Sequence, residues 1–125
     1  MDAKFAYRET AVRGATPVQL VILLYEQLIQ DLRRAIVAME KNQIERRTAE
    51  LNHALAVIAH LQSVLNLERG GQIARNLEQF YSALRASLVE AQGRVSRSIL
   101  QQQIVNLLAL REAWIQVDLA VGTAK

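Results

Sequence analysis

One stretch of the chain has the residue types and the spacing of a metal site. Glu50 and His53 form a Glu-x-x-His pair, the spacing by which carboxylate-bridged di-iron bundles supply ligands, and His60 lies two turns further on. A di-metal bundle needs this pair twice, together with two more inward glutamates, whereas the chain holds it once. On a helical wheel all three residues also fall outside the apolar stripe of their helix. We therefore interpret them as exposed helix residues and expect no metal site.

Other patterns that carry catalysis are also missing. No serine has a base at a suitable spacing, Gly70-Gly71 lacks the lysine of a phosphate-binding loop, and no GxGxxG follows a strand. The chain contains no cysteine, which excludes a disulfide framework and thiol chemistry. We expect neither an enzyme nor a bound cofactor.

Composition favours a single all-α domain over residues 1–125. Hydrophobic residues make up 51% of the 125 residues, there is one proline, and no Val/Ile/Thr-rich alternation indicates a strand. Apolar runs such as Leu20–Tyr25 are far shorter than the ~20 residues of a membrane span, so no membrane insertion is expected. Residues 1–16 contain no apolar export signal, which together with the absence of cysteine fits the cytoplasm.

The net charge of +3 raises the question of nucleic-acid binding. The basic residues are dispersed, however, at three helix ends or loops and are not interleaved with aromatic side chains. Solvated rims of a helical bundle explain them better, and we expect no nucleic-acid partner. The residues concerned are Arg33, Arg34, Arg46, Arg47, Arg94 and Arg97.

Four helices can be placed from their end signals. Thr16, Pro17 and Gln19 form a capping box with proline at the first helical position, which predicts a helix over 17–40. Further helices are expected at about 45–67, 72–92 and 98–120, with Gly70-Gly71 breaking the chain, Gly93 closing the third helix, and Ser98 to Gln101 capping the fourth. Short connections make neighbouring helices antiparallel, so an up-down four-helix bundle follows a short extended cap segment over 1–15.

The first and fourth helices carry more apolar surface than one bundle core needs. Apolar residues of the first cover an arc of about 200°, against roughly 100° for an ordinary amphipathic helix. The fourth has two apolar stripes with Arg111 and Asp118 between them, and the stripe that holds Trp114 would line an external groove. A partner helix, a symmetry mate in a homodimer or a larger core would each explain the surplus. The candidate partner-binding residues are Val18, Ile22, Tyr25, Ile29, Leu107, Leu110, Trp114 and Val117.

The segment before the first helix adds one more candidate, Tyr7. Phe5, Tyr7 and Val12 stand among charges without periodicity and precede Gly14, so this segment is expected to be extended. It is either a lid whose aromatic residues lie in an apolar groove until a ligand arrives, or a frayed terminus.

Several segments in the same order resemble the flagellar secretion chaperones, the FliS family that protects flagellin. The likeness runs nearly end to end. It is carried by Tyr7 with Val12, Ala15–Pro17, Leu24–Ile29, Gly70–Leu77 with Phe80-Tyr81, and Leu107–Trp114.

The resemblance implies a small antiparallel bundle, not an enzyme, that binds the disordered C-terminal segment of flagellin one to one in the cytoplasm. It implies that the protein blocks premature filament assembly and presents flagellin to the export gate of the flagellar type III apparatus. By the same resemblance Tyr7 occupies the binding site of the free protein, and the surplus stripes take the client. Glu26-Gln27, Phe80–Ser82 and Ala91-Gln92 depart from the family pattern, which leaves the identity of the filament-protein client open. The free protein could form a homodimer. The alternative function is a self-associating helical bundle that acts as a structural or adaptor module.

Overall fold

Helices make up nearly all of the part of the chain that the structure describes. The computed structural model describes residues 14–65 and 70–123, and within them the elements are α2 (Pro17–Glu40), α3 (Ile44–Ser63), α4 (Gly71–Arg94) and α5 (Arg97–Thr123). No strand occurs in these residues. The prediction of an all-α four-helix bundle is confirmed, while most of the expected cap segment, including Tyr7, lies outside the described residues.

The start of α2 follows the predicted capping box. The Thr16 hydroxyl accepts a hydrogen bond from the Gln19 backbone N–H at 3.2 Å, and the Gln19 side-chain oxygen accepts one from the Thr16 N–H at 3.3 Å. Pro17 occupies the first turn, where its missing N–H costs nothing. These bonds fix the direction in which α2 leaves residues 14 and 15.

The other helix ends differ from the expectation in detail. α3 stops at Ser63, where the Leu65 N–H bonds to the Gln62 carbonyl and tightens the last turn. Gly93 does not close α4, because the helix continues to Arg94. Val95 follows as its C-cap, in the left-handed region at φ 51°.

The cap of α5 is also displaced from its expected position. The Ser96 hydroxyl, not that of Ser98, accepts a hydrogen bond from the Ile99 backbone N–H at 3.3 Å. The chain reverses at Val95, which has a left-handed backbone conformation. Ser96 is therefore the last residue before α5 and takes the capping position in place of Ser98.

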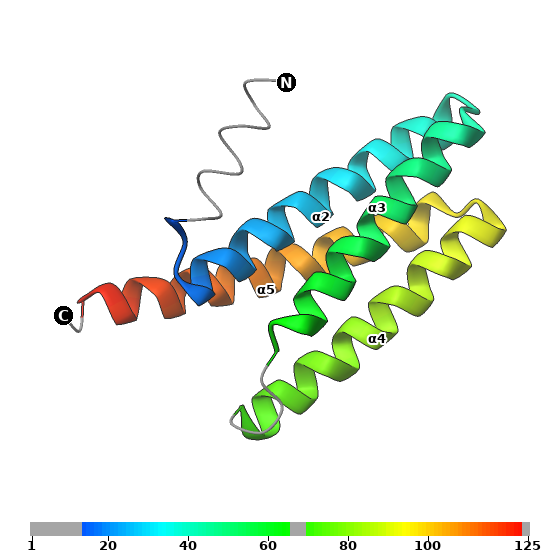
Figure 1. Cartoon of the computed structure of the whole chain (residues 1–125). Coiled ribbons are helices and arrows are strands. Elements are labelled where there is room, and N and C mark those ends of the chain that lie inside the picture. The colour runs from blue at the N-terminus through cyan, green and yellow to red at the C-terminus, as the bar shows by residue number, and fades with distance from the viewer. Residues whose placement is uncertain (1–13, 66–69, 124–125) are drawn as a thin grey trace.

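The helices enclose one core. α2 packs against α3 and α5, and α4 packs against the same two helices, so α2 and α4 lie on a diagonal. Figure 1 shows the four helices close together at the end that carries the α2–α3 and α4–α5 connections. Towards the other end, the start of α2 and the end of α5 diverge from the end of α3 and the start of α4. The bundle is therefore splayed, and the α2–α5 pair projects at one side.

Candidate protein-binding site

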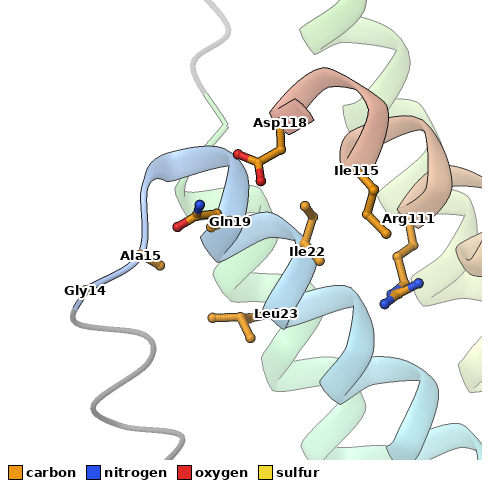
Figure 2. Close-up of a pocket in the computed structure, with 8 residues that line it drawn as sticks. All are labelled: Gly14, Ala15, Gln19, Ile22, Leu23, Arg111, Ile115 and Asp118. Carbon is orange, nitrogen blue, oxygen red and sulfur yellow. The ribbon is translucent and has the colours of Figure 1, made fainter. Parts of the chain in front are cut away.

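A groove lies between the projecting ends of α2 and α5. It forms a cavity of about 390 Å³, and Figure 2 shows the side chains of both helices around it. Ile22 of α2 faces Ile115 of α5, Leu23 lies on the side of α2 towards Ala15, and Arg111 and Asp118 supply one charge of each sign. The lining is completed by Gly14, Ala15 and Gln19.

Helical periodicity brings these residues to the groove. Gln19, Ile22 and Leu23 follow an i, i+3, i+4 spacing beside the core stripe of α2, and residues 111, 115 and 118 follow an i, i+4, i+7 spacing on α5. The Arg111 guanidinium lies 3.7 Å from the Glu26 carboxylate, so an ion pair spans the two helices at the groove. This pair ties α5 to α2 next to the cavity, although a partly exposed ion pair contributes little stability.

An apolar stripe continues from the groove along the outer face of α5. Leu108 is 40% exposed and Leu119 is 57% exposed, and both share a helical face with Ile115 of the cavity. Val105, one turn before Leu108, is exposed as well. The surplus apolar surface predicted for the fourth helix is thus present, in the stripe without the tryptophan.

The other stripe of α5 packs inward. Trp114 is half-buried against the core, and its indole N–H donates a hydrogen bond to the Tyr25 hydroxyl at 3.2 Å. The Tyr25 hydroxyl is also 2.8 Å from that of Tyr81, and the two rings meet edge to face with centroids 6.3 Å apart. These three side chains join α2, α4 and α5 across the bundle diagonal. The indole of Trp114 thus finds its hydrogen-bond partner inside the bundle, and the α2–α5 cavity is not lined by the Trp114 stripe.

The electrostatics of this interior cluster follow from burial. Desolvation raises the pKa of Tyr25, which the hydrogen bonds from Tyr81 and Trp114 partly offset. Desolvation also raises the pKa of Tyr81, and the charge and hydrogen bond of Tyr25 add to it. Both hydroxyls consequently stay protonated at neutral pH and act as structural hydrogen-bonding groups.

The sequence-predicted residues fall into four groups: buried, half-buried, exposed and outside the described residues. Tyr25, Ile29 and Leu107 are at most 3% exposed, so they belong to the core and offer no surface to a partner. Wheel angles placed them beside exposed positions, but α3 and α5 pack against α2 and bury these side chains in the core. Val18, Ile22, Leu110 and Trp114 are half-buried, Val117 is 44% exposed, and Tyr7 lies outside the described residues.

Two features of the structure were not expected from the sequence. The groove lining includes Leu23, which was not among the candidates although its position on the helical wheel, next to Gln19 and Ile22, could have indicated it. Asp31 is 1% exposed, accepts a hydrogen bond from the Gln27 side chain at 2.9 Å, and lies 2.6 Å from the His53 ring nitrogen. Asp31 lies three residues after the core residue Leu28 and so on the same face of α2, which means that a carboxylate occupies a core position.

His53 therefore has a structural partner. Its ring is 55% exposed, yet it reaches over the buried Asp31 from α3. Among the described residues no group of three or more histidine, aspartate or glutamate side chains is arranged to hold a metal ion. Within the same residues, no helix has the length and apolarity that crossing a bilayer requires.

The fold and the groove define an all-α four-helix bundle with an apolar trough between its first and last described helices. Comparison with known proteins then gives the family. The family model described as Flagellar protein FliS matches residues 1–121, and the chain belongs to this family of flagellar secretion chaperones.

The matches with individual relatives cover most of both sequences. The chain is 34% identical over 106 residues to the flagellar secretion chaperone FliSB of Pseudomonas aeruginosa, a match that covers 85% of this chain and 84% of the relative. It is 30% identical over 111 residues to FliS of Salmonella typhimurium (88% and 82%) and 29% identical over 116 residues to FliS of Vibrio cholerae (90% and 85%).

Proposed function

We propose that this protein is a cytoplasmic export chaperone that binds the disordered C-terminal segment of flagellin, prevents its premature polymerisation and supports its delivery to the flagellar type III export gate. Family membership supports the general role. The observation that carries the docking site is the α2–α5 groove, a cavity of about 390 Å³ that continues into the exposed stripe of Leu108 and Leu119 on α5.

The shape and chemistry of this surface suit an amphipathic helix formed by the client. Ile22, Leu23 and Ile115 offer an apolar floor into which client side chains at i, i+3, i+4 and i+7 can pack. Arg111 and Asp118 beside this floor can pair with polar client groups and fix the direction of the bound segment. A disordered client loses conformational entropy when it folds onto the groove, at a cost of roughly 2 to 5 kcal/mol or more, so binding stays reversible.

The remaining sequence-predicted residues belong to the edges of this surface. Val18 lies one turn before Ile22, and Val117 lies close in sequence to Ile115 and Asp118. Leu110 and Trp114 pack on the core with part of their surface accessible. Tyr7 stays a proposal: it precedes Gly14, which lines the cavity, and in the free protein it would compete with flagellin for the groove.

Size-exclusion chromatography of the protein mixed with flagellin tests this function. We expect a one-to-one complex with full-length flagellin and none with flagellin that lacks its C-terminal segment. A dimer that forms regardless of flagellin would instead support the self-associating bundle, in which the α5 stripe packs against its symmetry mate.

A matched pair of variants tests the docking surface. Leu108→Glu with Leu119→Glu should weaken flagellin binding by about tenfold or more, because two apolar contacts become charged. Ile73→Glu with Val89→Glu is the control, since both residues are exposed on α4, away from the groove. All four substitutions are at exposed positions, so each should change stability by only about 0.5 kcal/mol. Equal loss of binding in both variants would contradict the assignment of the α5 stripe.

A further inference from the structure

A second hollow lies towards the other end of α2 and is lined by arginines. Arg33, Arg34 and Val37 of α2 and Arg46 of α3 enclose about 170 Å³. Arg33 and Arg46 are exposed, Arg34 is half-buried, and Val37 is 46% exposed. Three arginine side chains and one valine thus line this hollow.

These arginines differ from the others that the structure describes. Each of the other described arginines has a hydrogen-bond or ion-pair partner within the chain, whereas Arg33, Arg34 and Arg46 have none among the described residues. The three without a partner are the same three that line the hollow. The paired arginines are Arg47, Arg75, Arg85, Arg94, Arg97 and Arg111.

The excess positive charge of the protein is concentrated around this hollow. Residues 33–47 contain five basic and two acidic side chains, an excess of three that equals the net charge of +3 of the whole chain. One of the two acids, Glu40, is 3.5 Å from Arg97 of α5. The tip of the α2–α3 hairpin therefore carries a positive potential that is not compensated locally.

We propose that this hollow is a second docking surface, which takes an acidic segment of a partner protein. The guanidinium fork pairs with carboxylates in a two-pronged geometry, and Val37 offers a contact for one small apolar side chain. The described lining contains no aromatic side chain on which a nucleic-acid base could stack, and its single apolar residue is too little to insert into a bilayer. Carboxylates on a polypeptide are thus the chemistry that fits.

This surface is separate from the α2–α5 groove. Arg34 lies twelve residues after Ile22 on the same helix, which corresponds to about 18 Å along the axis. A client in the groove and an acidic segment at the hairpin tip would therefore bind at the same time. The second surface does not depend on flagellin being the client.

Fluorescence anisotropy with a rhodamine-labelled peptide of repeated Glu-Glu-Ala tests the proposal on the full chain. The peptide should bind at about 50 mM NaCl and weaken as salt is raised to about 300 mM, since the contacts are exposed ion pairs. The variant Arg33→Glu with Arg46→Glu should lose roughly tenfold or more in affinity. The control Arg75→Glu with Arg94→Glu makes the same change in net charge on α4 and should lose less than about twofold.

Other results would overturn the proposal. If both double variants bind the peptide equally weakly, the effect is due to net charge alone. If the unsubstituted protein does not bind the peptide, the hollow is not a docking site. Tighter, Arg33- and Arg46-dependent binding of a single-stranded oligonucleotide or of phosphatidylserine vesicles would assign the hollow to a different class of partner. If saturating flagellin displaces the peptide, the two surfaces are not separate. If flagellin does not bind at all, the proposed function fails while the peptide titration still decides this inference.

Discussion

At the scale of single residues, Tyr25 and Tyr81 make the stability of the bundle depend on alkaline pH. Burial is the main cause that raises the pKa of both phenols in the folded state. Unfolded tyrosines lose their protons near pH 10, so above that pH the unfolded state binds fewer protons than the folded state. The stabilisation from the two buried phenols should therefore be fully present below about pH 10 and be lost progressively above it, as the unfolded state releases its tyrosine protons.

The variant Tyr81→Phe checks this prediction. Urea unfolding from about pH 9 to about pH 11.5 should show a shallower decline in the variant than in the natural sequence, because one titrating phenol is gone. Tyr81 is the better position to change, since Tyr25 also accepts the hydrogen bond of Trp114. Parallel declines in the two proteins would show that the buried pair does not titrate as proposed.

His53 and Asp31 give a second prediction at this scale. His53→Ala should lower the free energy of unfolding by about 1 to 3 kcal/mol, because Asp31 is 1% exposed and would lose one of its two hydrogen-bond partners. His60→Ala is the control on the same helix, where the side chain is exposed, and should change stability by only about 0.5 kcal/mol. Urea unfolding midpoints measure the stability of both variants. Equal midpoints for His53→Ala and His60→Ala would contradict the stabilising role of the His53–Asp31 contact.

At the scale of elements, the α4–α5 connection stores backbone strain at Val95. A β-branched residue in the left-handed region is unfavourable, and Val95 at φ 51° is 48% exposed, so its side chain contributes little packing. Val95→Gly should therefore leave the protein equally stable or more stable, by up to about 1 kcal/mol. Asn42→Gly, at φ 56° in the α2–α3 connection, is the comparison and should gain less, because asparagine tolerates this region. A clear loss of stability in Val95→Gly would contradict the strain.

At the scale of the whole molecule, the two candidate functions predict different thermal behaviour. A chaperone with a free groove should unfold at a temperature that does not depend on its own concentration and that rises when flagellin is added. The gain at a free flagellin concentration of about 100 Kd is about 2.7 kcal/mol. A self-associating bundle should instead become more heat-resistant as its own concentration rises. Differential scanning calorimetry over a dilution series, with and without flagellin, separates them.

The sequence by itself determined the elements of this protein. Thr16, Pro17 and Gln19 specify the start of α2 through backbone geometry and local hydrogen bonds, and helical periodicity predicts each amphipathic helix without knowledge of its neighbours. The apolar surplus on α5 was likewise visible as two stripes. The family resemblance followed from the same local segments and is confirmed by the family match.

Only the tertiary structure decided which residues of those stripes are exposed. A wheel gives the angle of each side chain on its own helix but not the direction from which neighbouring helices approach. Trp114 packs on the core, where Tyr25 on α2 accepts its N–H, whereas Leu108 and Leu119 are exposed on another face of α5. The burial of Asp31 beneath His53 and the meeting of Arg33, Arg34 and Arg46 at one hollow depend on the same register between α2 and α3. Contacts between residues distant in the chain are set by packing, and local sequence patterns do not encode them.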